Sequence, residues 1–69
     1  MIDIRALPHA AIREGRRVAT ERKASFRALF DDSLDGDLAR MVVRARLRKR
    51  YPAVPGLEIA LAVEEALEP

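Results

Sequence analysis

The fold is decided by one stretch of the chain, PHAAIREGRRVATERKASFRALF at residues 8–30. On a helical wheel of about 100° per residue, its apolar and small side chains fall within one arc of about 120°. These residues are Ala11, Ile12, Gly15, Val18, Ala19, Phe26, Leu29 and Phe30. Pro8 suits the first turn of a helix, where its missing N–H would have no partner. The pattern predicts one long amphipathic helix over residues 8–30.

Two features interrupt this apolar face. Gly15 and Ala19 leave its middle nearly flat. Such a surface either lets another helix approach closely or marks a weak point, since glycine in a helix costs about 1 kcal/mol relative to alanine. Arg22 lies inside the apolar arc. We expect its aliphatic stem to lie along the edge of the core with the guanidinium in water, and the alternative is a chain break at that point.

A second helix is predicted over residues 37–50, after an acidic turn rich in residues that cap helices and bend chains. Pro52 ends it, because a proline disfavours helical geometry in the preceding residue. The side chains at helical spacing that we expect to face the core are Leu38, Met41, Val42 and Ala45.

Residues 57–67 carry an ambiguous signal. Leu57, Ile59, Leu61 and Val63 alternate as in a strand, whereas the alanines and glutamates of the segment favour a helix, which we predict. The alternating start of the chain, residues 2–4, allows a short N-terminal strand, which would need a pairing partner. The expected fold is therefore all-α, with a helical hairpin and a short third helix in a single small domain over residues 1–69.

Composition narrows the class of protein. The chain is 49% hydrophobic and 35% charged, which is too apolar for a disordered tail. It has neither an apolar run of roughly 20 residues nor a signal-peptide pattern, so we expect a cytoplasmic protein that does not enter membranes. Without cysteine there is no disulfide or thiolate metal site. A homodimer that covers Leu57, Leu61 or the Gly15 surface would add stability.

Catalysis is not expected. His9 is the only histidine, Ser25 and Ser33 are the only serines, and there is no cysteine, so the chain offers no nucleophile and base pair. The three glycines lie about 20 residues apart and form no phosphate-binding loop. We therefore predict a protein that is not an enzyme and needs no cofactor.

The acidic turn partly matches a calcium-binding EF-hand loop. Residues at loop positions 1, 3, 5, 6 and 8 fit the motif, and these are Asp31, Ser33, Asp35, Gly36 and Leu38. Position 12, which should hold a bidentate glutamate, is Val42. We therefore predict a helix-capping turn and no metal site.

Charge alternates along the chain. The net charge is +5 over residues 5–30, −4 over 31–37, +6 over 38–51 and −4 over 52–69. Either the acidic segments fold back on the basic ones, or a basic face stays open for an anionic partner. Stripes of arginine on helices can contact phosphates at several points. The candidate nucleic-acid-binding residues are Arg13, Arg16, Arg17, Lys23, Arg27, Arg40, Arg44, Arg48, Lys49 and Arg50.

The first half of the chain carries short motifs: IDIR at residues 2–5, LP at 7–8, ASF at 24–26 and ALF at 28–30. Together they resemble the opening of ribbon-helix-helix repressors and antitoxins. The resemblance implies a short strand that pairs across a dimer, with Asp3 and Arg5 facing the DNA major groove, and a second helix led by Ser25. The chain departs from the pattern at the extra Ala6, at a turn that lacks the usual glycine, and in an apolar arc that continues across the expected break.

Two functions remain open. The first, which we favour, is a small nucleic-acid-binding regulator that uses basic helical faces. The chain contains no asparagine or glutamine and few aromatic residues, so sequence readout would rest on arginine alone. The second is a protein-binding adaptor, inhibitor or accessory subunit that acts through apolar and charged helical surfaces.

Overall fold

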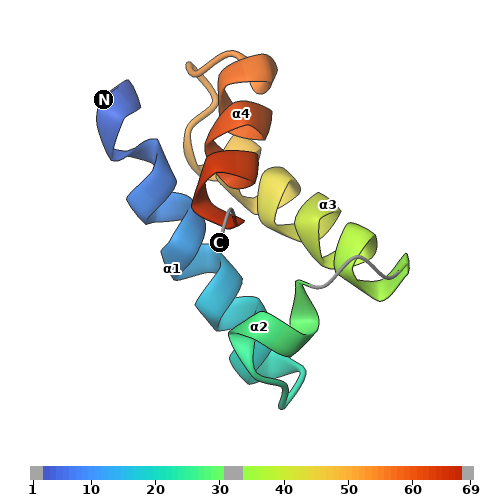
Figure 1. Cartoon of the computed structure of the whole chain (residues 1–69). Helices are drawn as coiled ribbons and strands as arrows, with labels where there is room; N and C mark the ends of the chain where they lie inside the picture. The colour runs from blue at the N-terminus through green and yellow to red at the C-terminus, as the bar shows by residue number, and fades with distance from the viewer. Residues whose placement is uncertain (1–2, 31–33, 68–69) are drawn as a thin grey trace.

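The computed structural model describes residues 3–30 and 34–67, and within these ranges the chain forms helices and no strand (Figure 1). A 3₁₀ turn, η1 (Ile4–Ala6), leads into α1 (Leu7–Glu21). The short α2 (Phe26–Leu29) follows, and then α3 (Leu34–Arg50) and α4 (Gly56–Leu67). The predicted all-α class is confirmed. The third predicted helix, over residues 57–67, is confirmed as α4.

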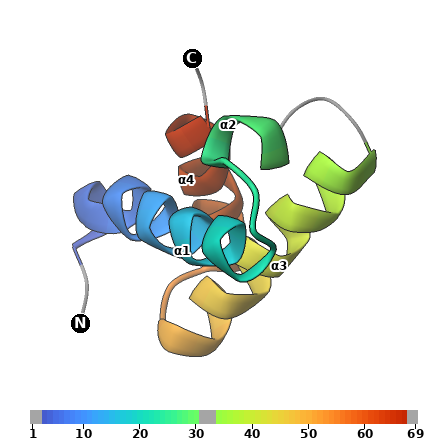
Figure 2. The ribbon, with the colours of Figure 1, turned by 90° about the horizontal axis from the view of Figure 1, so that it is seen from below.

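Helix α1 is the centre of the arrangement, because it packs against α3, α4, α2 and η1 (Figure 1). Viewed from below, α2 lies between the end of α1 and the start of α3 (Figure 2). The radius of gyration is 11.2 Å, close to the about 11 Å expected for a compact chain of this length. None of the helices in the two described ranges is long and apolar enough to cross a membrane.

The core takes side chains from each of the three long helices. The largest fully buried ones are Leu7, Val18, Val43, Leu47, Ile59 and Val63. Because α1, α3 and α4 each supply two of them, removing any one helix would expose apolar surface on the other two.

The prediction of one continuous helix over residues 8–30 is wrong. Helix α1 ends at Glu21, and the backbone of Lys23 adopts a left-handed conformation with φ of 54°. The Ser25 hydroxyl oxygen then accepts a hydrogen bond of 3.2 Å from the Ala28 N–H and begins α2. The alternative of a chain break near Arg22 is therefore the correct one.

The break places two aromatic rings over the flat part of α1. A Cβ added at Gly15 would lie only 2.7 Å from Cε2 of Phe26 and 3.3 Å from Cε2 of Phe30. The two ring centroids are 4.9 Å apart. Gly15 is thus needed for a close approach, and α2 of the same chain covers the surface that we expected another helix or a second chain to cover.

The predicted core face of α3 is wrong for three of its four residues, whereas Val42 does pack against the core. This helix begins at Leu34, three residues before the expected start, and its buried apolar residues are Ala39, Val43 and Leu47. The predicted residues lie elsewhere: Leu38 is 46% exposed and Met41 is 59% exposed. Ala45 is exposed and Val42 is half-buried. Helix α3 therefore carries apolar side chains on two sides. The side with Ala39, Val43 and Leu47, which is flanked by Arg46 and Arg50, faces α1.

Residues 3–6 form a capped 3₁₀ turn where the ribbon-helix-helix resemblance implies part of a strand. An Asp3 carboxylate oxygen accepts a hydrogen bond of 3.0 Å from the Arg5 N–H and caps η1. The same carboxylate forms an exposed ion pair with the Arg5 guanidinium at 3.4 Å. Ile2 lies outside the described residues, and so do Asp31 and Ser33 of the EF-hand pattern. The structure does contain the second helix led by Ser25 that the resemblance implies.

Candidate nucleic-acid interface

The contact between α1 and α3 is built around the buried carboxylate of Glu14, whose side chain is 7% exposed. Arg50 donates a hydrogen bond of 3.2 Å to its Oε1 atom. Arg46 and Arg17 lie within 4.0 and 3.9 Å of its two oxygens. A buried carboxylate is stable only when cations or donors surround it, and here α3 supplies two of the three arginines.

About two helical turns after Glu14, Glu21 forms a bidentate pair with Arg46. The two guanidinium nitrogens donate to the two carboxylate oxygens over 2.5 and 3.0 Å. The hydrogen bond from Arg46 lowers the pKa of the Glu21 carboxyl, and the same bond raises the pKa of Arg46. Together Glu14 and Glu21 hold α3 against α1.

Sequence reasoning did not single out Glu14 or Glu21. Their signal is present in the chain: they are the only acidic residues within residues 5–30, and they lie seven positions apart on one side of the helix. Arg46 and Arg50, spaced by four, present a matching pair. The spacing of four is shared by Arg40, Arg44 and Arg48, so the sequence indicates a basic partner for the acids of α1 without selecting Arg46 and Arg50.

Three of the candidate arginines form a ridge along α3 at a spacing of four residues, Arg40, Arg44 and Arg48. This ridge is largely engaged within the chain. Arg40 is mostly buried and donates to an Asp37 carboxylate oxygen and to the Phe30 carbonyl, each over 3.3 Å. Arg44 reaches across to α4, where its Nη2 atom donates to Oε1 of Glu64 over 3.0 Å. Arg48, at the end of the ridge, is exposed and forms no ion pair with a described residue.

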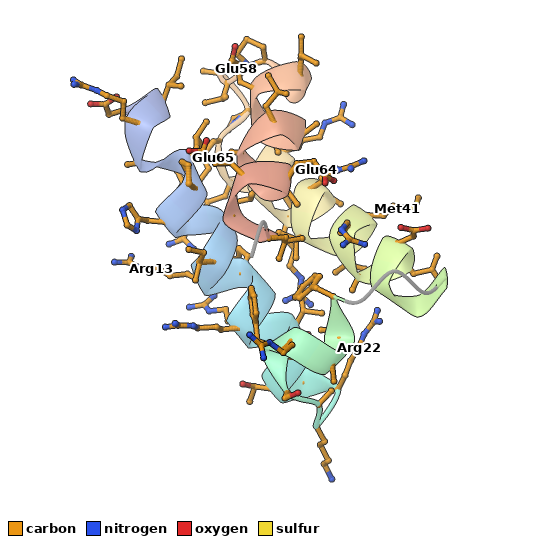
Figure 3. All side chains as sticks on the ribbon, viewed as in Figure 1. Arg13, Arg22, Met41, Glu58, Glu64 and Glu65 are labelled. Carbon is orange, nitrogen blue, oxygen red and sulfur yellow. The ribbon has the colours of Figure 1, made fainter. Side chains whose placement is uncertain are left out.

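The cations on the outer face of α1 have a different environment. Arg13 and Arg16 are exposed, and neither forms an ion pair with any residue in the described ranges. With Arg17, Thr20 and Glu21 they line a shallow open depression along the helix. Figure 3 shows Arg13 pointing away from α3 and α4. These cations remain exposed because the two acidic residues of α1, Glu14 and Glu21, pair with arginines of α3.

A second depression connects this face to the end of α3. Arg17 from α1 and Lys49 from α3 both line it, and its other lining residues are Glu14, Glu21, Arg46 and Arg50. Arg17 therefore borders both depressions. We refer to Arg13, Arg16, Arg17 and Lys49 as the basic surface.

The ten candidate residues thus fall into separate groups. Four form the basic surface, and Arg50 lies beside it but is occupied by Glu14, with its guanidinium carbon 6.0 Å from the centre of the Tyr51 ring. Lys23 and Arg27 are exposed beyond the helix break. The structure therefore does not assemble all ten on one face.

Comparison with known proteins adds no relative: no family model, no curated protein and no solved structure matches this chain. Within residues 3–30 and 34–67, no group of three or more histidine, cysteine or acidic residues could hold a metal ion.

Proposed function

We propose that this chain is a small non-catalytic nucleic-acid-binding regulator that contacts phosphates through the basic surface. One observation carries the proposal: Glu14 and Glu21 turn toward α3 and pair with its arginines, while Arg13, Arg16 and Arg17 face outward and meet Lys49 across a shared depression. Arg13, Arg16 and Lys49 form no ion pair with a described residue, and Arg17 is 68% exposed at 3.9 Å from Glu14. These cations can therefore replace the counterions of a phosphate backbone, and only Arg17 has an internal ion pair to give up.

The chemistry of this surface favours backbone contacts over base readout. Arginine and lysine bind phosphate in any sequence context, and the chain has no asparagine or glutamine to read adenine edges. The proposed binding is therefore dominated by charge. Its strength falls steeply with salt concentration.

The test is fluorescence anisotropy of a labelled DNA duplex titrated at several salt concentrations. Four phosphate contacts predict a log–log salt slope of about −3.6. The double variant Arg13→Gln, Arg16→Gln removes two contacts without breaking an ion pair, so the slope becomes shallower by about 2.

A matched control removes the same charge elsewhere. Arg22 and Arg27 are exposed near the helix break and form no ion pair with a described residue. The double variant Arg22→Gln, Arg27→Gln keeps the wild-type slope. Equal losses in both double variants would show that only net charge matters, and a flat titration at low salt would exclude nucleic-acid binding.

A second candidate function, a protein-binding adaptor, inhibitor or accessory subunit, is supported by α4. Leu57 is 70% exposed and Leu61, one turn later, is 55% exposed. Large apolar side chains grouped on one helix face are typical of partner-binding surfaces. This function predicts that an apolar fluorescent dye binds the chain and that the double variant Leu57→Ser, Leu61→Ser reduces the signal more than Leu38→Ser, Met41→Ser does, while DNA binding is unchanged.

A further inference from the structure

The outer side of α3 carries an apolar stripe that no described residue covers. Leu38 is 46% exposed, Met41 is 59% exposed, and Ala45 is also exposed. Their spacing of three and then four residues aligns them along one line of the helix. Figure 3 shows Met41 projecting from α3 away from α1. We call these three residues the outer stripe.

The two ends of the outer stripe have opposite charge. Asp37 is exposed at its N-terminal end, where one carboxylate oxygen accepts from Arg40 of the same helix, and Arg48 and Lys49 are exposed at its C-terminal end. If two copies of α3 lay antiparallel, the acid of each would approach the bases of the other. A parallel arrangement would bring like charges together, and the helix dipoles add to the same preference.

We infer that a second copy of this chain binds the outer stripe, with the two α3 helices antiparallel about a two-fold axis. Met41 then lies opposite the partner's Ala45, whose small side chain allows the helices to approach closely. In this register, Asp37 lies beside the partner's Arg48 and the partner's Lys49. The inference goes beyond the proposed function, because the outer stripe and the basic surface are separate. Lys49, at the edge of the proposed dimer contact, is the one residue that takes part in both.

The charge around α4 explains why the second copy selects α3. The exposed leucines of α4 share their helix with Glu58, Glu64 and Glu65, and α4 carries no base. Two copies of α4 would therefore repel each other.

Sedimentation equilibrium over a range of protein concentrations tests the inference. The wild-type chain is expected to dimerise with a dissociation constant of about 10–100 μM, as is typical of a small interface. Met41→Lys buries a charge opposite the partner's Ala45 and weakens association at least about tenfold. Leu61→Lys makes the same chemical change on α4 and leaves the dimer intact. A monomeric wild type, or equal loss in both variants, would overturn the inference.

The absence of cysteine from the chain makes the orientation testable by disulfide formation. Met41→Cys and Ala45→Cys chains are oxidised separately and as a mixture, with circular dichroism confirming that both fold. The antiparallel register brings position 41 next to the partner's position 45, within the roughly 4.4–6.8 Å between Cα atoms that a disulfide needs. Cross-linking is therefore fastest in the mixture. Equally fast cross-linking of each variant alone would instead indicate a parallel pair and refute the register.

Discussion

The inner and outer sides of α3 carry similar apolar side chains in very different surroundings. On the inner side, Ala39, Val43 and Leu47 are buried, whereas on the outer side Leu38 and Met41 are about half exposed. Apolar content alone therefore did not select the side that packs. The inner side also positions Arg46 and Arg50 against the acids of α1. Turning the helix over would move these arginines away from Glu14 and Glu21, so charge and burial select the same side.

The largest expected difference between the two sides follows from removing one leucine from each. Leu47 is fully buried, so Leu47→Ala lowers the free energy of unfolding by about 2–5 kcal/mol. Leu38→Ala makes the same change on the outer side and costs no more than about 0.5 kcal/mol when measured on the dilute monomer. Urea denaturation followed by circular dichroism provides both values. Similar losses would show that the outer side packs as well as the inner.

A smaller difference is expected for the acids that contact α3. Glu14→Gln removes the charge that holds Arg50, and because Arg50 is 56% exposed and can return to water, the loss is about 1–2 kcal/mol. Glu64→Gln affects only the exposed pair with Arg44 and costs less than about 0.5 kcal/mol. The same denaturation experiment compares them. An equal or larger loss for Glu64→Gln would contradict the central role of Glu14.

The smallest effect is a pH dependence on the inner side. The pKa of Glu21 is held below its ordinary value of 4.5 by Arg46. Stability from this pair is therefore fully present above the carboxyl's unfolded pKa and is lost as the pH falls through the lowered folded value. Glu21→Gln reduces the loss of stability seen in acid, and Glu65→Gln, an exposed acid on α4, does not. Parallel acid denaturation curves for wild type and Glu21→Gln would disprove this contribution.

The sequence predicted the fold class and α4, but it favoured one continuous helix over residues 8–30 and offered the break near Arg22 only as the alternative. A wheel detects only periodicity, and the turn at residues 22–25 spans four residues, which is about one helical turn. The side chains of Phe26, Leu29 and Phe30 therefore keep the angular phase of α1 although they belong to α2. Arg22 was the one residue inconsistent with a continuous helix, and it marks the break.

The candidate site was predicted only in part, for a related reason. Sequence identifies the cations, but which of them remain exposed depends on the side of each helix that packs. Once the inner side of α3 faces α1, Arg46 and Arg50 are used internally, and Arg44 meets Glu64 on α4. Of the basic surface, Arg13, Arg16 and Lys49 lie outside these pairings, and Arg17 stays exposed beside Glu14.

The central position of α1 also affects how the chain folds. Its partners α3 and α4 lie far along the sequence, and Val18 is separated from Val63 by about two thirds of the chain. Each such contact must first close a long loop of disordered chain. During synthesis, α1 emerges before α3 and α4 and lacks two of its apolar partners until Ile59 and Val63 have been added. The packing of α1 is therefore complete only after α4, the last of the described helices, has been made.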